Sequence, residues 1–364
     1  MHDSILENFG YNDFFESNRK TLGLSEFDVA RVISEHKGAY ELINQNGKFL
    51  AKITGKQMFN AESREDYPAV GDWTLMKDLG NKQAVIFGIL PRKTVIKRIY
   101  GDKDRLGNKN DVQIIATNID TAFIVEAVNR DYNLNRFERY FAIVRNQEIT
   151  PVIILNKADL IPKNDLGLIV AEIKGRFKDV DIILTSTLND EGLNELTSYI
   201  EKGKTYCFLG SSGVGKSSLI NKLLENNIIK VGDISEYSDR GKHTTTSREM
   251  YFLKNGGIVI DNPGIREVGI SDISSGVNDI FNEIIELGKK CKFRNCTHTN
   301  ESGCEILKAL EEGRLDKQKY FNFLNIGKEL NYFDMSKLEK RKKEKDFGKF
   351  INKVKKDLKN RGKY

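Results

Sequence analysis

The chain carries two nucleotide-binding motifs in an unusual order. Residues 210–217 read GSSGVGKS and fit the phosphate-binding pattern G-x-x-x-x-G-K-[ST]. Asn156-Lys157-Ala158-Asp159 fits N-K-x-D, a guanine-reading pattern, and it precedes the phosphate-binding motif. In an ordinary GTPase it follows that motif. Together the two motifs predict a GTP-binding domain whose sequence is circularly permuted.

The phosphate-binding motif has the setting that its chemistry requires. A short apolar segment, 205–209, precedes it, and apolar residues recur at helical spacing behind it. In a strand, glycine loop and helix, backbone N–H groups and the helix N-terminus face the phosphates. We expect Lys216 to reach the β- and γ-phosphates and the Ser217 hydroxyl to bind Mg²⁺. The alternative is a glycine turn that only joins a strand to a helix. The loop residues expected to contact nucleotide are Gly210, Ser211, Ser212, Gly213, Val214, Gly215, Lys216, Ser217 and Ser218.

The guanine-reading pattern occurs twice, because residues 108–111 also match it. That copy follows a polar, turn-like stretch, whereas Asn156 follows the apolar segment 151–155. Ligands of open α/β sheets bind at the carboxyl ends of strands, so we assign the guanine site to the second copy. The Asp159 carboxylate can accept hydrogen bonds from guanine N1–H and the 2-amino group, and Lys157 can pack over the ring. The alternative is an ordinary polar turn.

Two further strand ends are expected to complete the nucleotide site. The apolar segment 257–260 ends in Asp261-Asn262-Pro263-Gly264, a D-x-P-G sequence. Asp261 would hold Mg²⁺ through water, and the Gly264 N–H would donate to the γ-phosphate. Thr185-Ser186-Thr187 follows another apolar segment, and backbone N–H groups around Ser186 could donate to guanine O6. The alternative for Ser186 is a plain turn at a strand end.

The segment 241–246, GKHTTT, lies in a polar stretch suited to a mobile switch. We expect Thr245 to complete the Mg²⁺ shell, although a solvated threonine-rich loop is the alternative. Ile265 stands where many GTPases carry the glutamine that orients the attacking water, and an isoleucine cannot do this. Hydrolysis should therefore be slow without help, or the polar group comes from elsewhere. His243 is the nearest candidate, so the predicted catalytic residues are Lys216, His243 and Thr245.

Three of the four cysteines form a second constellation with a histidine: Cys291, Cys296, His298 and Cys304. Such a Cys₃His set suits one tetrahedral Zn²⁺ with no position open for water, which indicates a structural site. The alternative is three reduced thiols in a local core. Cys207, in the apolar segment before the phosphate loop, reads as a core residue. The start of the chain has no signal-peptide pattern, and no run of about 18 apolar residues occurs, so we expect a cytoplasmic protein without disulfides or membrane spans.

The elements that must position these residues form a multidomain chain. Five short β segments, 28–34, 39–44, 48–54, 72–77 and 82–90, favour an OB-fold barrel, with an SH3-like barrel as the alternative. From residue 121 strands and helices alternate, as in a parallel α/β sheet. The predicted domains are an N-terminal extension (1–26), an OB-fold barrel (27–100), a circularly permuted GTPase domain (101–280), an α-rich zinc-binding domain (281–315) and a basic helical tail (316–364).

Positive charge is concentrated near the end of the chain. Residues 337–363 contain thirteen Lys/Arg against four Asp/Glu, a net of +9, which leaves −3 for the rest of a chain whose total is +6. Apolar residues recur there at helical spacing, which predicts an amphipathic helix with a basic face. Such a face suits the phosphates of RNA. A solvated helix packed on its own protein and a membrane-surface helix are the alternatives.

Four features together resemble the bacterial ribosome small-subunit-dependent GTPase A family: the permuted motif order, the G-x-H-T-T-T segment, D-x-P-G followed by an aliphatic residue, and Cys-x4-Cys-x-His-x5-Cys. The resemblance covers about residues 29–304. It implies an N-terminal OB-fold barrel, a permuted GTPase domain and a C-terminal zinc domain. It also implies binding to the 30S subunit and its 16S rRNA late in assembly, and stimulation of GTP hydrolysis by the subunit. The chain departs from the family at Lys242, usually arginine, and at 54–57, which is less basic than usual.

Two classes of function follow from these motifs. The first is a monomeric GTPase whose GTP or GDP state sets its affinity for the small ribosomal subunit. The second is an RNA-binding protein in which nucleotide only stabilises the fold. A complete set of Mg²⁺ and γ-phosphate ligands favours the first class. A third, weaker alternative is an ATP-binding protein in which the N-K-x-D match is fortuitous.

Overall fold

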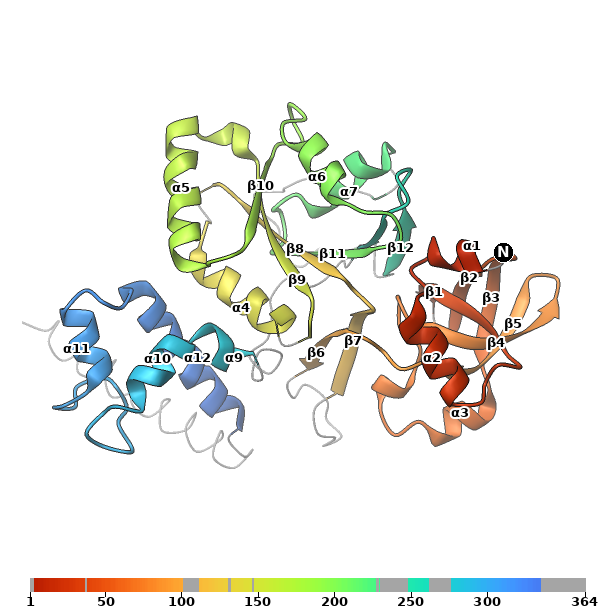
Figure 1. Cartoon of the computed structure of the whole chain (residues 1–364), viewed down its shortest axis with the longest axis horizontal. Helices are drawn as coiled ribbons and strands as arrows, with labels where there is room; N and C mark the ends of the chain where they lie inside the picture. The colour runs from red at the N-terminus through yellow and green to blue at the C-terminus, as the bar shows by residue number, and fades with distance from the viewer. Residues whose placement is uncertain are drawn as a thin grey trace, which may run out of the picture. The chain divides into compact units, whose positions relative to one another are not determined.

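In a computed structural model of the protein, the chain divides into two units, Met1–Ile280 and Phe281–Tyr364, which are described separately (Figure 1). The structure describes residues 3–36, 38–100, 111–129, 132–145, 147–226, 229, 248–261 and 276–334. The predicted site residues His243, Thr245 and Gly264 therefore lie outside the described residues, as does the predicted amphipathic helix of the tail.

The N-terminal barrel has five strands, β1 (Asp28–His36), β2 (Ala39–Asn44), β3 (Gly47–Ile53), β4 (Trp73–Gly80) and β5 (Gln83–Ile89). Their order is β1-β2-β3-β5-β4, β4 pairs back with β1, and only β3 and β5 are parallel. This closed arrangement confirms the OB-fold and excludes the SH3-like alternative. Alternate side chains fill the interior, among them Val32, Leu42, Phe49, Met76 and Ile86. Helix α3 (Gly55–Asn60) and the 3-10 turn η1 (Arg64–Asp66) lead from β3 to β4.

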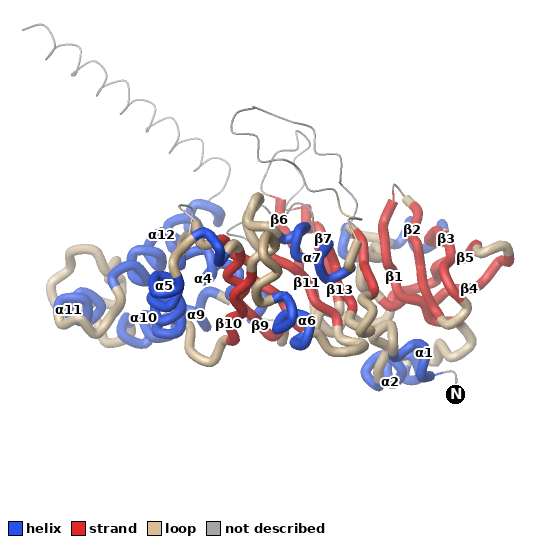
Figure 2. Tube along the Cα trace, turned by 90° about the horizontal axis from the view of Figure 1, so that it is seen from above, coloured by secondary structure: helices blue, strands red, loops and turns tan. Residues whose placement is uncertain are grey.

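The N-terminal extension is helical and packs against the barrel. Helices α1 (Asp3–Glu7) and α2 (Asp13–Thr21) lie beside it in Figure 2, and the Asn12 side chain caps α2 by accepting from Phe14 N–H at 3.1 Å. Their buried residues Leu6 and Phe15 form a small core with Trp73 and Leu90. Trp73 is fully buried, so the extension is part of the folded unit.

A parallel sheet follows the barrel, and its strands are β8 (Thr121–Ala127), β9 (Thr150–Asn156), β10 (Asp181–Thr185), β11 (Thr205–Leu209), β12 (Glu249–Phe252) and β13 (Ile258–Asp261). The order is β10-β9-β8-β11-β13-β12, in which only β12 is antiparallel. Strands β8 and β11 are buried along their whole length, as expected when helices cover both faces. The helices are α4 (Leu134–Arg145), α5 (Lys163–Arg176), α6 (Leu193–Tyr199), α7 (Lys216–Leu224) and α9 (Val277–Ile280); α6 and α7 share a core with one face of the sheet.

An antiparallel hairpin, β6 (Val95–Tyr100) with β7 (Asp111–Thr117), connects the barrel to this sheet. Tyr100 pairs with Asp111, so the domain boundary that we predicted between residues 100 and 101 falls inside the hairpin. The hairpin also holds the end of the rival N-K-x-D match. Asp111 begins an antiparallel strand, so it does not lie at the carboxyl end of a parallel strand.

Arg31 joins the barrel to the parallel sheet. Its side chain is buried, and its guanidinium donates to the backbone oxygens of Phe9, Gly71 and Asn118 and to Thr205 Oγ1 at 2.9 Å. Burial lowers the pKa of Arg31 to about 10, opposed by the nearby carboxylates of Asp120 and Asp72. Backbone pairing also crosses this junction, because Ser34 of β1 bridges to Glu249 of β12. One buried cation thus contacts the extension, the barrel and β11 at the same time.

The second unit is built from α10 (Asn282–Gly288), α11 (Glu305–Glu311) and α12 (Lys317–Asp334), with no strand among its described residues (Figure 2). Apolar side chains such as Ile284, Ile306 and Ile326 are buried between these helices. The loop from residue 289 to residue 304 contains three of the four cysteines, Cys291, Cys296 and Cys304. No helix in the described ranges has both the length and the apolar character that crossing a bilayer requires.

Gly71 should be irreplaceable at the junction. Its φ is +101°, and a Cβ there would lie 2.2 Å from the Thr117 carbonyl oxygen. We expect Gly71→Ala to lower the free energy of unfolding by about 3 kcal/mol in urea titrations. The strain of an alanine at positive φ and the clash of its Cβ with the Thr117 carbonyl both contribute to this loss. Gly80→Ala is the matched control, because Gly80 has φ +85° and open space around it. This substitution should lower the free energy of unfolding by only about 1 kcal/mol. Equal losses in the two variants would contradict the role of the clash.

Candidate nucleotide and metal sites

The predicted nucleotide-binding segments meet at one edge of the parallel sheet. Strands β10, β9, β8, β11 and β13 run parallel, so their carboxyl ends lie along the same edge. Asn156 ends β9, Ser186 follows β10, Gly210 follows β11, and Asp261 ends β13. Binding of ligands outside the carboxyl ends of strands is typical of such sheets. The structure therefore brings together four segments that are up to about a hundred residues apart in the chain.

The phosphate loop has the backbone that its glycines permit. Gly213 and Gly215 have φ of +83° and +98°, in the region that favours glycine. A Cβ at Gly210 would lie 2.3 Å from the Val125 carbonyl oxygen of the neighbouring strand. Helix α7 begins at Lys216, so its N-terminal amides face the loop. The Lys216 ammonium lies within the loop and donates to the carbonyl oxygens of Gly210 (2.6 Å) and Ser211 (2.7 Å).

Asn156 connects the guanine-reading segment to the phosphate loop. Its side chain is fully buried, and its Nδ2 donates to the Val214 carbonyl oxygen at 2.8 Å. Its Oδ1 accepts from Thr185 Oγ1 at 3.0 Å, at the end of the next strand. A Cβ at Gly215 would lie 2.2 Å from Asn156 Nδ2, so only glycine allows this approach. Sequence reasoning did not identify Thr185 as a partner of Asn156.

Asp159 is exposed at the edge of the sheet, where a base could reach it. Lys157 adopts the left-handed conformation, with φ of +61°, and the buried Ala158 begins the short turn η2 (Ala158–Leu160) that carries Asp159. The Ser186 hydroxyl donates to the Asp159 carboxylate and accepts from Leu188 N–H. The Ser186 N–H itself donates to the Glu191 carbonyl oxygen at 3.0 Å. In this structure the Ser186 hydroxyl therefore orients Asp159, while the Ser186 N–H is paired within its own turn.

Asp261 is buried at the last position of β13, opposite Glu249 of β12. Next to it in the sheet is β11, which leads into the phosphate loop, so Asp261 ends one strand away from Gly210. Ser217 and Ser218 lie in the first turn of α7 and are partly buried. A carboxylate at the end of β13 and a hydroxyl in the first turn of α7 are suitable oxygen ligands for Mg²⁺, directly or through water.

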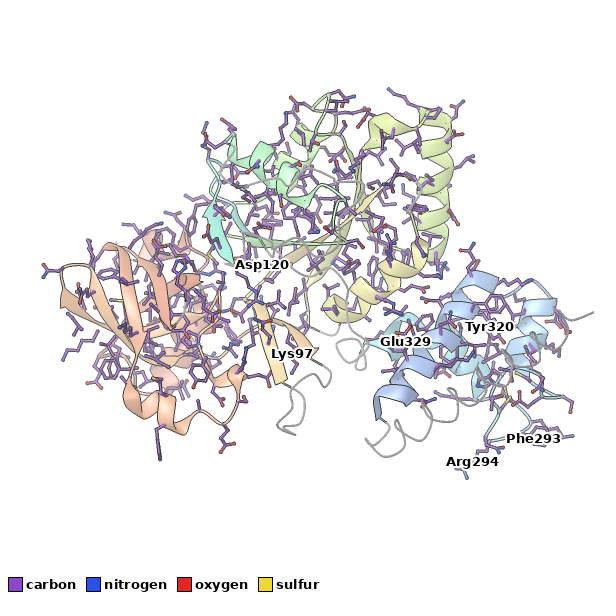
Figure 3. The ribbon with its side chains drawn as sticks, turned by 180° about the vertical axis from the view of Figure 1, so that it is seen from behind. Lys97, Asp120, Phe293, Arg294, Tyr320 and Glu329 are labelled. Atoms are coloured by element: carbon purple, nitrogen blue, oxygen red, sulfur yellow. The ribbon has the colours of Figure 1, made fainter. Side chains whose placement is uncertain are left out.

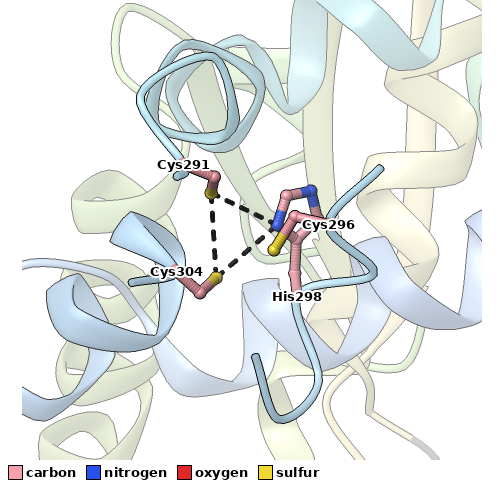
Figure 4. Close-up of side chains that lie close together, drawn as sticks. All are labelled: Cys291, Cys296, His298 and Cys304. Atoms are coloured by element: carbon pink, nitrogen blue, oxygen red, sulfur yellow. Dashed lines mark hydrogen bonds between the residues drawn. The ribbon is translucent and has the colours of Figure 1, made fainter. Parts of the chain in front are cut away.

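The second unit holds a compact set of four possible metal ligands: Cys291, Cys296, His298 and Cys304 (Figure 4). Their ligand atoms all lie within 4.8 Å of one another. Sγ of Cys291 and Sγ of Cys304 are 3.8 Å apart, and each is 3.6 Å from His298 Nδ1. Four ligands arranged tetrahedrally around Zn²⁺ would put two sulfurs about 3.8 Å apart and sulfur and nitrogen about 3.6 Å apart. Burial lowers the pKa of His298, which favours the neutral imidazole that a metal needs.

Two residues outside the sequence prediction hold this loop in place. Tyr320 of α12 donates its hydroxyl to the His298 carbonyl oxygen at 2.6 Å. The Glu301 carboxylate accepts from the Thr297 hydroxyl and from the N–H groups of Thr297, Thr299 and Asn300. The Thr297 hydroxyl above all, together with the N–H groups of Thr297 and Asn300, keeps the pKa of Glu301 well below its usual range. The threonines on either side of His298 could have indicated that a nearby acceptor such as Glu301 caps this turn. Nothing local in the sequence indicates Tyr320.

Comparisons with known proteins agree with this architecture. A family model described as RsgA GTPase matches residues 89–271. The Small ribosomal subunit biogenesis GTPase RsgA 1 of Bacteroides thetaiotaomicron is 36% identical over 352 residues, which cover 96% of this chain and 97% of that protein. The Small ribosomal subunit biogenesis GTPase RsgA 2 of Lactiplantibacillus plantarum is 38% identical over 322 residues, which cover 88% of this chain and 89% of that protein.

Solved structures are similar as well. The crystal structure of YjeQ from Thermotoga maritima has a TM-score of 0.59 at 25% identity and covers 83% of this chain and 98% of that one. YloQ, a circularly permuted GTPase, has a TM-score of 0.58 at 22% identity and covers 85% and 97%, which supports the fold alone. The family predicted from the motifs is thereby confirmed: the chain belongs to the RsgA GTPase family.

Proposed function

We propose that this chain binds the small (30S) ribosomal subunit and hydrolyses GTP to drive a late step in the maturation of that subunit. The observation that carries the GTP assignment is the buried Asn156 amide, which fixes the guanine-reading turn against the phosphate loop. The names of the relatives support the ribosomal partner. The protein acts as a monomer in the cytoplasm, with 16S rRNA as the component of the subunit that it contacts.

The guanine base binds beside Asp159. The Ser186 hydroxyl holds one carboxylate oxygen, which aligns the group to accept from guanine N1–H and the 2-amino group. Adenine presents no such pair of donors, so ATP is discriminated against by an unpaired carboxylate. Lys157 covers the ring. This arrangement argues against the alternative in which the N-K-x-D match is fortuitous.

The phosphates bind in the loop 210–218. Lys216 now donates to two loop carbonyls, and with GTP bound its ammonium contacts the β- and γ-phosphates instead. Ser217, Thr245 and Asp261 would hold Mg²⁺ when GTP is bound, and the Gly264 N–H would donate to the γ-phosphate. When bound, Mg²⁺ neutralises charge that develops on the phosphate oxygens.

Hydrolysis depends on the ribosomal partner. Ile265 cannot orient water, so the free protein turns over GTP slowly. The small subunit orders the switch, and His243 then positions the attacking water. The segment after Asp261 leads within twenty residues to the second unit at Phe281, so nucleotide state can be transmitted to that unit.

The Cys₃His set holds one structural Zn²⁺ per chain. Three sulfur donors and one imidazole select Zn²⁺ over harder cations, and four protein ligands leave no coordination position for substrate. The distances among Cys291, Cys304 and His298 support this assignment. When bound, the ion would cross-link the beginning of the loop after α10, its middle, and the start of α11.

The guanine assignment predicts a switch of base preference. Asp159→Asn should weaken GTP binding by about 100-fold or more and raise relative affinity for xanthosine triphosphate, because an amide donates where the carboxylate accepted. Fluorescent-nucleotide competition with GTP, ATP and xanthosine triphosphate measures this. Asp111→Asn is the control, since Asp111 lies in the β6–β7 hairpin and should behave like the parent. If only Asp111→Asn loses GTP, the guanine site has been misplaced.

The metal assignment predicts about one Zn²⁺ per chain by elemental analysis of protein purified without chelator. Cys296→Ala should lose that zinc and increase proteolysis of the second unit, while GTP binding by the first unit is retained. The Cys207→Ala variant should keep the zinc, because Cys207 is buried in β11 of the first unit and is not one of the four clustered ligands. Zinc-free parent protein would remove the ion from the proposal.

The catalytic assignment predicts that 30S subunits accelerate GTP turnover and that His243→Ala lowers the stimulated rate by about 100-fold, with nucleotide affinity nearly unchanged. Lys216→Ala should weaken both nucleotide binding and turnover. Single-turnover assays with saturating subunits distinguish the two variants. Turnover that does not respond to subunits would instead favour an RNA-binding protein with structural nucleotide. Parental rates in His243→Ala would assign the water-positioning group to another residue or to the ribosome.

A further inference from the structure

An aromatic side chain is presented to solvent between two of the metal ligands. Phe293 lies between Cys291 and Cys296, and 44% of it is exposed. In Figure 3 the side chains of Phe293 and Arg294 point away from the helices of the second unit, whereas Tyr320 lies among them. An exposed phenylalanine alone carries little information, because much of any protein surface is apolar.

The backbone around Phe293 is held at both ends. Lys292 N–H donates to the Gly303 carbonyl oxygen at 3.0 Å, and Cys296 N–H donates to the Phe293 carbonyl oxygen at 3.3 Å. Cys291 and Cys296 belong to the four-ligand cluster. An aromatic ring on such a loop loses little conformational freedom when a partner binds, which favours binding.

A cation is placed beside the ring. The Lys292 side chain lies against Gly303, which has φ of +78°. A Cβ added to Gly303 would lie 3.0 Å from Lys292 Cβ. Glycine at residue 303 therefore leaves room for the lysine stem. The Lys292 ammonium is 5.5 Å from the centre of the Phe293 ring. One surface thus combines an aromatic face with a positive charge.

The loop is strongly basic, and its charge is not neutralised within the described part of the chain. Lys289, Lys290, Lys292 and Arg294 are all exposed, and only Lys289 pairs with an acid, Glu286, among the described residues. The nearby Glu301 carboxylate is occupied by backbone N–H groups of its own turn. Three cations flanking an exposed ring suit a partner that offers both a flat π-face and several negative charges.

We propose that this loop, residues 289–296, binds an unpaired nucleotide of RNA. The base stacks on Phe293, and Lys290, Lys292 and Arg294 contact the phosphates on either side. Stacking on an aromatic side chain requires an unpaired base, because the bases of a duplex are already stacked. An acidic peptide would satisfy the cations but would leave the ring unused, so the combination favours RNA. The inference rests on the proposed function only in that the RNA would be that of the small subunit.

The test uses the full-length zinc-loaded protein and a fluorescein-labelled single-stranded RNA of twelve nucleotides, with the matching duplex for comparison. We expect Phe293→Ala to weaken single-strand binding by about 10-fold without changing the salt slope, and to leave duplex binding unchanged. Arg294→Ala should weaken binding to both and lower the salt slope by about one. Phe321→Ala is the matched control, since Phe321 is 50% exposed and belongs to α12, outside the loop 289–296. It should bind like the parent.

A second variant reports stacking directly. The chain has a single tryptophan, Trp73, which is buried in the first unit, so F293W adds one exposed indole. Its fluorescence should be quenched by the single strand, with affinity at or above that of the parent. Parental RNA affinity in Phe293→Ala, or an unquenched indole, would overturn the proposal, as would an acidic peptide that competes with the RNA.

The two proposals can fail separately. Stimulation of GTP turnover by 30S subunits tests the proposed function, and oligonucleotide binding by the isolated protein tests the loop. Zinc content measured for each variant establishes that the cluster is intact.

Discussion

The nucleotide site depends on the buried amide of Asn156. This one side chain donates to the phosphate loop and accepts from the end of β10, so it fixes three strand ends relative to one another. Both partners are buried, and losing either bond would leave a polar group unsatisfied, at about 1–3 kcal/mol each. The absence of a Cβ at Gly215 is what allows the amide to come so close. Because these contacts are tertiary, they are the same whether the guanine motif precedes or follows the phosphate loop.

The permuted order determines what the nucleotide domain is connected to. The barrel and its helical extension precede β8 and are attached through the buried Arg31, which donates to oxygens of the extension, the barrel and β11. A buried guanidinium with several oxygen partners is costly to displace, which makes this junction rigid. At the other end, β13 carries Asp261 and leads toward the second unit. The barrel is therefore attached to the GTPase sheet through a buried cation, and the second unit follows in the chain after the strand that ends in Asp261.

The second unit illustrates how a small helical unit is stabilised. The three helices in its described part, residues 281–334, bury a modest set of apolar side chains, and the long loop between α10 and α11 is polar. A metal ion held by the Cys₃His set would compensate for a small core by fixing segments that side-chain packing alone would not hold. Tyr320 and Glu301 add hydrogen bonds that orient the loop around His298. The same loop, once fixed, presents Phe293 and its basic neighbours to solvent.

The sequence by itself determined the features that depend on local pattern. It predicted the strand, loop and helix around Lys216, the five barrel strands, the Cys₃His set and the family, because these follow from spacing and periodicity over short stretches. Only the tertiary structure decided the choice of OB-fold over SH3-like barrel, since that depends on the parallel pairing of β3 with β5. It also placed the β6–β7 hairpin across the predicted domain boundary and showed that the Ser186 hydroxyl donates to Asp159. Arg31 contacts Thr205, 174 positions away, and Asn156 contacts Val214, 58 positions away. Contacts of that separation arise from chain topology, and no local pattern of residue types encodes them.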